Sequence, residues 1–567
     1  MCGIYHGHFS HAILAISSRR IPRPLIQTVR TEYLLHWRRI MSSSDAANHK
    51  GELKKRSIAG SFLFKLPHGD EKQAQVALFK RSGKVSTYRH KYAPISGSVE
   101  KYDVNPLATA LREINEETGL TLSSIELLRV GKPYSFVDES VGREWTINPF
   151  GFRLKEKSEG GEGEEGITID WEHEGFKWFN PLNVNESDEF GGVPKLVNSL
   201  RRVWPEYDLG PKAGKVLTSG LQQLRNDHES GARQLADLAI LIMKKIITEM
   251  DSDTIDDKWW GNIRMAAWHI CKTRESMGAA ITSAVVKALD RVETILTQDI
   301  SPREKTRQMT DVLENQLSQR QSTTDRIRDA FVDYLRQHVI PTMTSGKELS
   351  ILTLSSSSTV SACLLQAAAN LGVSLDLRIL ESRPLYEGVT LASKLLGTDV
   401  DSEGLNVTIY TDASSALAAD KIHVVILGAD RISSSGDVSN KIGSLPAILS
   451  QRHVAPDARV VILSETEKIA GPGTMEDHTA EENSSAELIG AWKGNVKGAD
   501  IIEDILKASE RNAGRGGNVF VRNFYFEWIP ARFVHAYVTD EGLWSVQNIR
   551  ERSEWIGKEV DRFFKDL

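Results

Sequence analysis

The second half of the chain alternates short apolar runs with stretches of helical spacing. Six apolar, mostly β-branched runs predict buried parallel strands. They lie at 350–354, 376–380, 407–410, 424–427, 460–463 and 534–538, and helices are expected between the first few at 360–371, 389–396 and 413–419. Such alternation predicts a doubly wound, Rossmann-like parallel sheet with right-handed crossovers over 346–555.

Two further patterns precede this sheet. Residues 56–205 mix short strands, expected at 61–66, 75–80, 145–154 and 175–179, with one helix at 107–118, and predict an α/β domain. Residues 213–345 keep apolar positions at helical spacing and predict a helical subdomain. The expected fold class is therefore α/β, with two α/β parts joined by a helical subdomain.

Length and composition agree with a multidomain globular protein. The 567 residues suggest roughly three or four units, and a net charge of −6 gives no bulk affinity for nucleic acid or an anionic membrane. The three cysteines have no paired spacing, which favours a reducing, cytoplasmic location. No apolar run is long enough to span a bilayer.

Two segments differ from the rest in composition. Residues 1–55 form an extension in which arginines precede the first acidic residue, Glu32. Either residues 1–40 are a mitochondrial presequence, or they are an upstream extension with Met41 as the natural start. Residues 471–517 are rich in Gly, Ser and Glu and predict a flexible insertion on the ligand side of the sheet.

The helix expected at 107–118 carries a row of carboxylates. Pro106 suits its first turn and Gly119 its C-terminal end. Glu113, Glu116 and Glu117 stand at i, i+3 and i+4 and share one face. The pattern predicts either a solvated acidic face or a site where magnesium cancels the repulsion and activates water beside a diphosphate.

This stretch, from Gly97 to Leu120, resembles the Nudix box of the Nudix hydrolases, Gly-x5-Glu-x7-Arg-Glu-U-x-Glu-Glu-x-Gly-U, where U is aliphatic. The second half, from Arg112 onward, matches at every fixed position. The first half departs from the motif, because Asp103 stands where the family has Glu and one extra residue precedes Arg112.

The resemblance implies an α/β/α sandwich that hydrolyses a nucleoside diphosphate derivative, with a nucleotide sugar as one candidate substrate. It implies a Mg²⁺ or Mn²⁺ ion bound by Gly97, Glu113, Glu116 and Glu117. It also implies that Arg112 orients a glutamate, which makes Arg112 and the three glutamates the expected catalytic residues. Substrate choice in the family lies in variable loops, so the sequence does not name the substrate.

Polar side chains follow the predicted strands of the second half. Ligands of doubly wound sheets bind beyond the carboxyl ends of the strands, so these side chains are expected to converge there. The candidates are Ser355, Arg383, Asp430, Asn440, Lys441 and Lys468. Asn440 and Lys441 are expected to open a helix, and Arg274 to lie near another helix start, both places where phosphate binds. This inventory suits a phosphorylated sugar, and the alternative is a set of structural turns and salt bridges.

Residues 213–555 resemble the translation initiation factor 2B alpha/beta/delta family, which includes the methylthioribose-1-phosphate and ribose-1,5-bisphosphate isomerases. The run 428–443, which begins Gly-Ala-Asp-Arg, looks more like the isomerases than like the initiation factor subunits. The run 381–384, Glu-Ser-Arg-Pro, is similar to the family's Glu-Thr-Arg-Pro, and 274–277, Arg-Glu-Ser-Met, to its Arg-Pro-Ser-Met.

The isomerases of this family are thought to move protons with a cysteine and an aspartate. Asp430 matches the aspartate, whereas Ser355 stands where the cysteine is expected. Cys363 lies two helical turns further on and is expected in the core. The family's Arg-Gly-Ala appears as Ser-Gly-Ala from Ser230, without an arginine that would hold phosphate. Because a serine is a far weaker acid than a thiol, the pocket either isomerises its ligand poorly or only binds and senses it.

The chain is therefore expected to be a Nudix hydrolase fused to a domain that binds a sugar phosphate or nucleotide. One alternative is a regulatory protein related to initiation factor 2B with a non-catalytic Nudix domain, and translation factors would be its partners. Another is an active aldose-phosphate isomerase. Relatives of the second domain commonly dimerise, which implies a homodimer through it.

Overall fold

The computed structural model describes most of the chain from residue 53 onward. The described ranges are 53–66, 74–227, 230–250, 253–274, 277–343, 348–397, 404–475, 482–494, 496–511 and 519–567. The extension expected at 1–55 lies outside the described residues except for its last three positions. Within the described ranges, no helix is both long enough and apolar enough to cross a bilayer.

The first domain is built on an eight-stranded sheet in which the recorded strand pairs are antiparallel. Its strands are β1 (Lys54–Lys65), β2 (Gln75–Arg81), β3 (Tyr92–Ala93), β4 (Ile95–Ser98), β5 (Ile125–Val130), β6 (Tyr134–Asp138), β7 (Arg143–Leu154) and β8 (His173–Phe179). The four strands expected from sequence are present, and β3 to β6 are additional. These four strands are between two and six residues long, and such short runs are hard to tell from loops in a sequence.

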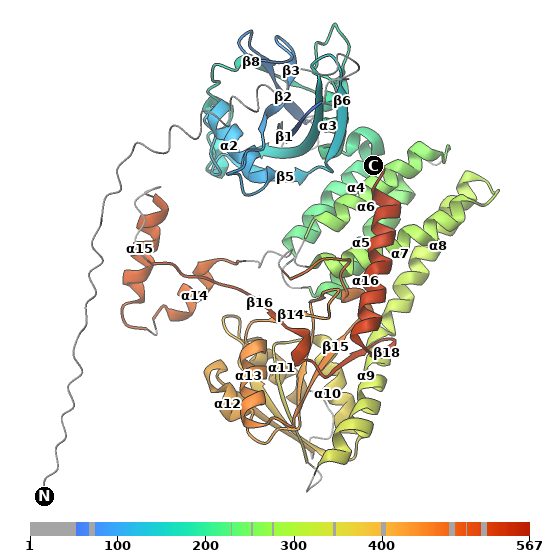
Figure 1. The fold of residues 1–567 in the computed structure, drawn as a ribbon, viewed down its shortest axis with the longest axis vertical. Coiled ribbons are helices and arrows are strands. Elements are labelled where there is room, and N and C mark those ends of the chain that lie inside the picture. Colours follow the sequence, from blue (N-terminus) through green and yellow to red (C-terminus); the bar gives the residue numbers. More distant parts are fainter. Residues whose placement is uncertain are drawn as a thin grey trace, which may run out of the picture. The chain divides into compact units, whose positions relative to one another are not determined.

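Two helices cover the two faces of this sheet. Residues alternate between faces along a strand, so Ala59 and Leu63 of β1 lie in one core while Phe62 and Phe64 lie in the other. The first core contains α2 (Pro106–Thr118), and the second contains α3 (Leu196–Val203). The domain is therefore an α/β/α sandwich (Figure 1).

A helical bundle follows. It consists of α4 (Glu206–Asn226), α5 (Ala232–Glu249), α6 (Asp257–Lys272), α7 (Gly278–Leu296) and α8 (Pro302–Gln321), with α9 (Thr323–Tyr334) leading to the next domain. The C-terminal helix α16 (Val546–Phe564) also packs on this bundle, with Phe563 and Phe564 buried in its core. Helix α16 is far from the bundle helices along the chain, and the sequence analysis did not predict that it packs on them.

The third part contains a seven-stranded sheet in the order β11-β10-β9-β12-β15-β17-β18. Its strands are β9 (Glu348–Leu354), β10 (Ser374–Leu380), β11 (Leu405–Tyr410), β12 (Val424–Leu427), β15 (Arg459–Ser464), β17 (Ala536–Thr539) and β18 (Gly542–Trp544). The first six are parallel, as expected, and β18 adds an antiparallel edge. The order reverses between β9 and β12, which creates the crevice where doubly wound sheets bind ligands.

Helices cover both faces of this sheet (Figure 1). One face packs against α9, α10 (Ser358–Asn370) and α11 (Glu387–Leu396), and the other against α12 (Ser415–Ala418) and α13 (Ser444–Val454). The described part of 471–517, expected as a flexible insertion, contains two helices, α14 (Ser485–Trp492) and α15 (Ala499–Arg511).

A small three-stranded sheet corrects one expectation. It pairs β13 (Arg431–Ile432), β14 (Val438–Lys441) and β16 (Phe526–Ile529), with β14 in the centre. The expectation that Asn440 and Lys441 open the following helix is wrong, because both residues end β14 and pair with β16. Helix α13 begins at Ser444, after Gly443 takes a left-handed conformation with φ 98°.

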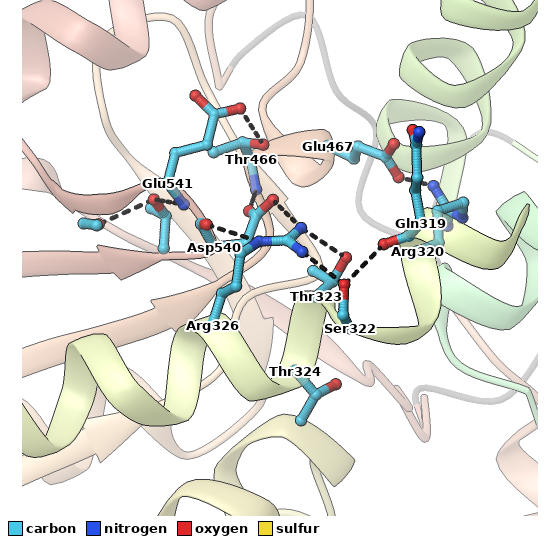
Figure 2. A network of polar contacts seen from close by, with 12 residues as sticks. Gln319, Arg320, Ser322, Thr323, Thr324, Arg326, Thr466, Glu467, Asp540 and Glu541 are labelled. Carbon is cyan, nitrogen blue, oxygen red and sulfur yellow. Dashed lines mark hydrogen bonds and ion pairs between the residues drawn. The ribbon is translucent and has the colours of Figure 1, made fainter. Parts of the chain in front are cut away.

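A polar network joins the bundle to the carboxyl edge of the seven-stranded sheet (Figure 2). Arg320, at the end of α8, forms an ion pair with Glu467 of the short helix η9 (Thr466–Lys468). Arg326 of α9 donates from Nε to the carbonyl oxygen of Asp540 at 3.1 Å. These contacts hold η9 at the end of β15, and Lys468 is the next residue after Glu467 along it.

Candidate functional sites

Local sequence chemistry explains why α2 presents its carboxylates in a fixed position. The Asn105 side chain caps the helix by accepting a hydrogen bond from the Ala108 amide at 2.9 Å, and Pro106 occupies the first turn. Gly119 ends the helix in the left-handed region with φ 71°. Ile114 is fully buried in the core, and Glu113 and Glu117 lie beside it on the neighbouring face of the helix.

Arg112 is the centre of the first candidate site. It contacts Asp103 through two hydrogen bonds, Nη2 to Oδ2 at 3.0 Å and Nε to Oδ1 at 3.2 Å. Its Nη1 donates to Glu113 Oε1 at 2.7 Å and to Glu116 Oε2 at 2.9 Å. The hydrogen bonds from Arg112 lower the pKa of Asp103 to about 2. Asp103, which replaces the Glu of the Nudix box, therefore serves as an anchor for Arg112.

Glu117 is the most buried of the three helix glutamates, with 3% of its surface exposed. Its Oε2 is hydrogen-bonded to His173 Nε2, and its Oε1 has no hydrogen-bond partner among the described residues. Burial and the nearby charge of Glu113 raise the pKa of Glu117 well above its usual range. Burial also raises the pKa of Glu113. A bound cation would relieve both effects, because it compensates buried negative charge.

Gly97 approaches this cluster through its backbone. A Cβ atom at position 97 would lie 1.8 Å from Glu113 Oε1, so only glycine leaves room for this carboxylate. Gly97 is held in β4 by its pairing with Ala59 of β1. The position thus brings a main-chain segment against the Glu113 carboxylate.

These donors fit a hard divalent cation. Carboxylate and carbonyl oxygens are the ligands that such cations prefer, and the partnerless Glu117 Oε1 lies in a buried, negatively charged surrounding. In the parts of the chain that the structure describes, no three His, Cys, Asp or Glu side chains are already arranged to hold a metal ion. Glu113 and Glu116 instead accept hydrogen bonds from Arg112. To bind a cation, each glutamate would have to replace part of this contact with Arg112 by a contact with the cation.

A cavity of about 400 Å³ opens beside this cluster. Gly97, Arg112 and Glu113 line it, together with Arg81 and Glu172. Arg81 offers a second cation next to the carboxylates, which suits the charge of a diphosphate. Sequence reasoning missed Arg81, Glu172 and the Glu117 partner His173. Arg81 ends β2, Glu172 precedes β8, and His173 begins β8. These residues are far from α2 in the chain, and only the folded sheet brings them close to it.

The second candidate site lies at the reversal of strand order in the parallel sheet. Ser355 follows β9, and its amide donates to Ser382 Oγ, beyond β10, at 2.8 Å. Asp412, beyond β11, accepts from the amides of Ser382 and Arg383 at 2.9 and 2.8 Å. Ser355 and Ser382 have left-handed backbones, with φ 67° and 62°. The ends of three neighbouring strands are therefore tied together by side chains.

Asp430 lies on the other side of the same crevice, after β12. Burial raises its pKa above the usual range, and the charges of Lys468 and Lys441 oppose this shift. Lys468 Nζ donates to the carbonyl oxygen of Ala429 at 2.7 Å. Lys441 Nζ lies 2.9 Å from Glu387 Oε1. The structure thus groups Asp430 with Lys441 and Lys468, and adds Glu387, which sequence reasoning did not identify.

Ser357, Gly428 and Asn440 also converge at this crevice. A Cβ at Gly428 would lie 3.3 Å from Ser357 Oγ and 3.7 Å from Asn440 Oδ1. Asn440 is buried, and its Nδ2 donates to Ser444 Oγ at 2.9 Å. The Asn440 amide is therefore fixed in place by the start of α13.

Two expected ligand-binding arginines have other partners. Arg274 donates from Nη1 to the carbonyl oxygen of Asp227. Arg383 donates from Nε to Glu381 at 3.1 Å, lies over the Tyr386 ring, and keeps 54% of its side chain exposed. Neither arginine has a recorded contact with Asp430, Lys441 or Lys468.

Comparison with protein families identifies two separate regions of the chain, one for each candidate site. Residues 228–546 match the Initiation factor 2 subunit family, and residues 67–198 match the NUDIX domain. The first match covers more than half of the chain. The chain therefore belongs to the Initiation factor 2 subunit family and carries a Nudix domain in addition.

Isomerases are among the curated relatives that match this chain. Methylthioribose-1-phosphate isomerase of Yarrowia lipolytica is 28% identical over 218 residues, which cover 36% of this chain and 55% of that protein. The Pelotomaculum thermopropionicum enzyme of the same name is 30% identical over 203 residues, covering 35% and 49%. Ribose 1,5-bisphosphate isomerase of Haloterrigena turkmenica is 28% identical over 215 residues, covering 37% and 59%. The chain thus spans about half the length of the curated relatives it matches.

Solved structures of initiation factor subunits are also similar. Pyrococcus horikoshii translation initiation factor eIF-2B is 19% identical with a TM-score of 0.40, covering 58% of this chain and 96% of that chain. Chaetomium thermophilum eIF2B beta is 14% identical with a TM-score of 0.42, covering 62% and 92%.

The two described cysteines do not supply the missing thiol of the second site. Cys271 and Cys363 are buried, and burial raises the pKa of each thiol to about 12. At pH 8 only about one thiol in ten thousand would then be ionised. We expect both to resist iodoacetamide in the native protein at pH 8 and to react after unfolding, as mapped by peptide mass spectrometry.

The Ser355→Cys variant serves as a positive control for the alkylation of an accessible thiol. Position 355 is only half-buried, so this new thiol should be alkylated in the native protein. Rapid native labelling of Cys363 would contradict its place in the core and reopen it as a candidate for proton transfer.

Proposed function

We propose that the Nudix domain hydrolyses the diphosphate bond of a nucleoside diphosphate derivative with the aid of Mg²⁺ or Mn²⁺. The observation that carries this proposal is the buried Glu117, one of whose oxygens has no hydrogen-bond partner among the described residues, on the same helix as the half-buried Glu113, which packs against Gly97. Such a group is costly to bury without a counter-charge. It is therefore better explained by a cation site than by a solvated acidic surface.

The residues have distinct roles in this proposal. Glu113, Glu116, Glu117 and the Gly97 backbone oxygen would hold the cation. When bound, the cation supplies Lewis acidity toward the phosphoryl oxygens and a water of lowered pKa. Arg112 orients Glu113 and Glu116, because Asp103 fixes its guanidinium from the other side.

For the second domain, we propose binding of a sugar phosphate or nucleotide in the crevice between β9 and β12. The grouping of Asp430 with Lys441 and Lys468 supports this proposal, since it places cations and one acid of raised pKa beside a polar crevice. Asp430 would exchange a proton with the ligand if the domain isomerises it. Ser355 would hydrogen-bond to the ligand, as would Asn440, and Arg274 and Arg383 would have to leave their present partners to join them.

The fusion suggests that the two activities are linked. Hydrolysis of a nucleotide sugar yields a nucleoside monophosphate and a sugar phosphate, and the second domain would receive one of these products. The alternative role, a regulatory protein related to initiation factor 2B, would place translation factors among its partners. We propose a homodimer through the second domain in either case.

The first test is a hydrolysis screen of the full chain with Mg²⁺, in which the nucleotide products are separated by chromatography and identified. The substrates are ADP-ribose, ADP-glucose, dinucleoside polyphosphates, NADH and nucleoside triphosphates. We expect turnover of a nucleotide sugar, and a loss of kcat of about a hundredfold or more in Glu116→Gln and Glu117→Gln, because each removes a cation ligand. Chelation of the metal should abolish turnover.

Glu139→Gln is the matched control. Glu139 is exposed on the loop between β6 and β7, does not line the cavity, and should leave kcat unchanged. Turnover that survives Glu117→Gln, or that no chelator removes, would refute the assignment of the carboxylate cluster.

The second test measures ligand binding by the second domain in the full chain. Ribose 1,5-bisphosphate and the sugar phosphate released by the Nudix reaction should bind with a Kd that rises about tenfold or more in Lys441→Ala, since a charged hydrogen bond is lost. Ser355→Cys should raise isomerase turnover if the scaffold already holds the substrate correctly.

Isothermal titration calorimetry gives the Kd, and Arg452→Ala on α13 serves as the control cation. Absence of binding by either sugar phosphate would rule out a sugar-phosphate site in this crevice and favour the regulatory role.

A further inference from the structure

A second cavity lies where the first domain meets the helical bundle. Its volume is about 770 Å³, within the range of about 300–1,000 Å³ that is usual for small-molecule sites. It is lined by the first turn of α2 and by β5 and β7 on one side, and by α4 and α6 on the other. Among the described residues, none lines both this cavity and the one beside the carboxylates. We call it the junction cavity.

Direct hydrogen bonds hold the two walls of the junction cavity together. Arg225 of α4 donates from Nη1 to the carbonyl oxygen of Leu127 at 3.2 Å and from Nη2 to that of Leu128 at 3.0 Å. Arg129 of β5 donates from Nη2 to Thr218 Oγ1 of α4 at 2.9 Å. These contacts cross from the edge strand β5 to the bundle, so they fix the positions of both guanidinium groups at the cavity.

Two buried polar side chains that line the junction cavity each have an atom without a hydrogen-bond partner. Arg129 is 4% exposed, and its Nη1 has no such partner among the described residues. Glu206 Oε2 lies 4.0 Å from this atom, which is beyond hydrogen-bond distance. His269 of α6 is 3% exposed, and its Nε2 also has no hydrogen-bond partner within the described ranges. Buried polar atoms are costly unless they are hydrogen-bonded, so each marks a place for a ligand atom.

The charged groups around the junction cavity are mostly positive. Arg129, Arg225 and Lys272 line it, and Lys272 is three residues after His269 on the same face of α6. Glu126 is the acidic residue among the described lining residues, and it is paired with Arg153 at 2.7 Å. The first turn of α2 adds the positive end of a helix dipole. The cavity therefore favours an anion.

The rest of the lining is largely apolar. Leu107, Leu127, Phe150 and Leu221 all contribute to it. An inorganic anion would leave this apolar surface in contact with water, whereas an organic anion would cover it. The donors from β5 and α6 suit the three terminal oxygens of a phosphate monoester better than the two oxygens of a carboxylate.

We infer that the junction cavity is a binding site for an organic phosphate, whose phosphate group lies at Arg129, His269 and Lys272 and whose carbon part covers the apolar lining. The site is separate from the carboxylate cluster and from the crevice of the second domain, and it depends on neither proposed function. Its walls come from the first domain and from the bundle. A ligand that binds there contacts both parts and stabilises the junction between them.

The experiment measures binding to the full chain without metal by isothermal titration calorimetry. The probes are phenyl phosphate, inorganic phosphate and phenol, which separate the contribution of the anion from that of the apolar group. Phenyl phosphate should bind saturably and about tenfold or more tightly than either of the other probes. Lys272→Gln should weaken this binding about tenfold or more, because a charged hydrogen bond is lost, and Lys272→Arg should retain it.

Lys258→Gln is the matched control. Lys258 is an exposed cation in the first turn of the same helix and does not line the junction cavity, so this variant should bind phenyl phosphate as the wild type does. Lys441→Ala, which alters the crevice of the second domain, should also leave the binding unchanged. Hydrogen–deuterium exchange should slow at residues 125–131 and 269–273 when phenyl phosphate is bound to the wild type.

Arg129→Met tests the buried cation and should abolish the preference for phenyl phosphate over phenol. Because this variant removes a buried hydrogen bond, its melting temperature is measured as well, and the exposed Lys272 provides the test that does not depend on folding. Absence of saturable binding would overturn the inference and show that the cavity is a hydrated gap. Binding that Lys272→Gln leaves intact, or that Lys441→Ala removes, would overturn it by placing the ligand elsewhere. Inorganic phosphate that binds as tightly as phenyl phosphate would contradict the organic part of the ligand.

Discussion

The hydrogen bonds that Arg112 makes with three carboxylates around it determine the first site. Like charges on one helix face repel, and burial makes the repulsion stronger. Arg112 offsets it by holding Asp103 on one side and Glu113 and Glu116 on the other. Glu117 is hydrogen-bonded to His173 instead, and its other oxygen is buried without a partner in the part of the chain that the structure describes. The site is therefore only partly neutralised by the protein itself, which is the condition that favours a bound cation.

The second site depends on a different constraint, the strand order of the parallel sheet. Because the order reverses between β9 and β12, the segments that follow these strands separate and leave a crevice. Ser355 and Asp430 come from its two sides. The Arg320–Glu467 ion pair holds η9 at the adjacent strand end, which keeps Lys468 beside Ala429 and Asp430. The pairing of the helical bundle with the sheet thus contributes to the geometry of the ligand site.

The sequence predicts strongly periodic features and local motifs well. The parallel strands, the helix α2 and the two families followed from residues that are near one another in the chain. Sequence reasoning did not predict contacts made only by the folded sheet, such as Glu117 with His173, or Lys441 with Glu387. It also placed Asn440 and Lys441 on a helix, because a polar pair after a strand looks the same whether a helix or a second small sheet follows.

The most direct test of this account is a Mn²⁺ titration of the full chain followed by electron paramagnetic resonance. The account predicts saturable binding that weakens about tenfold or more in Glu113→Gln and in Glu117→Gln, because each loses a charged oxygen ligand. Glu139→Gln should bind as the wild type does. No saturable binding, or equal binding by all four proteins, would show that the buried carboxylates of α2 do not hold a cation, and would contradict the central claim.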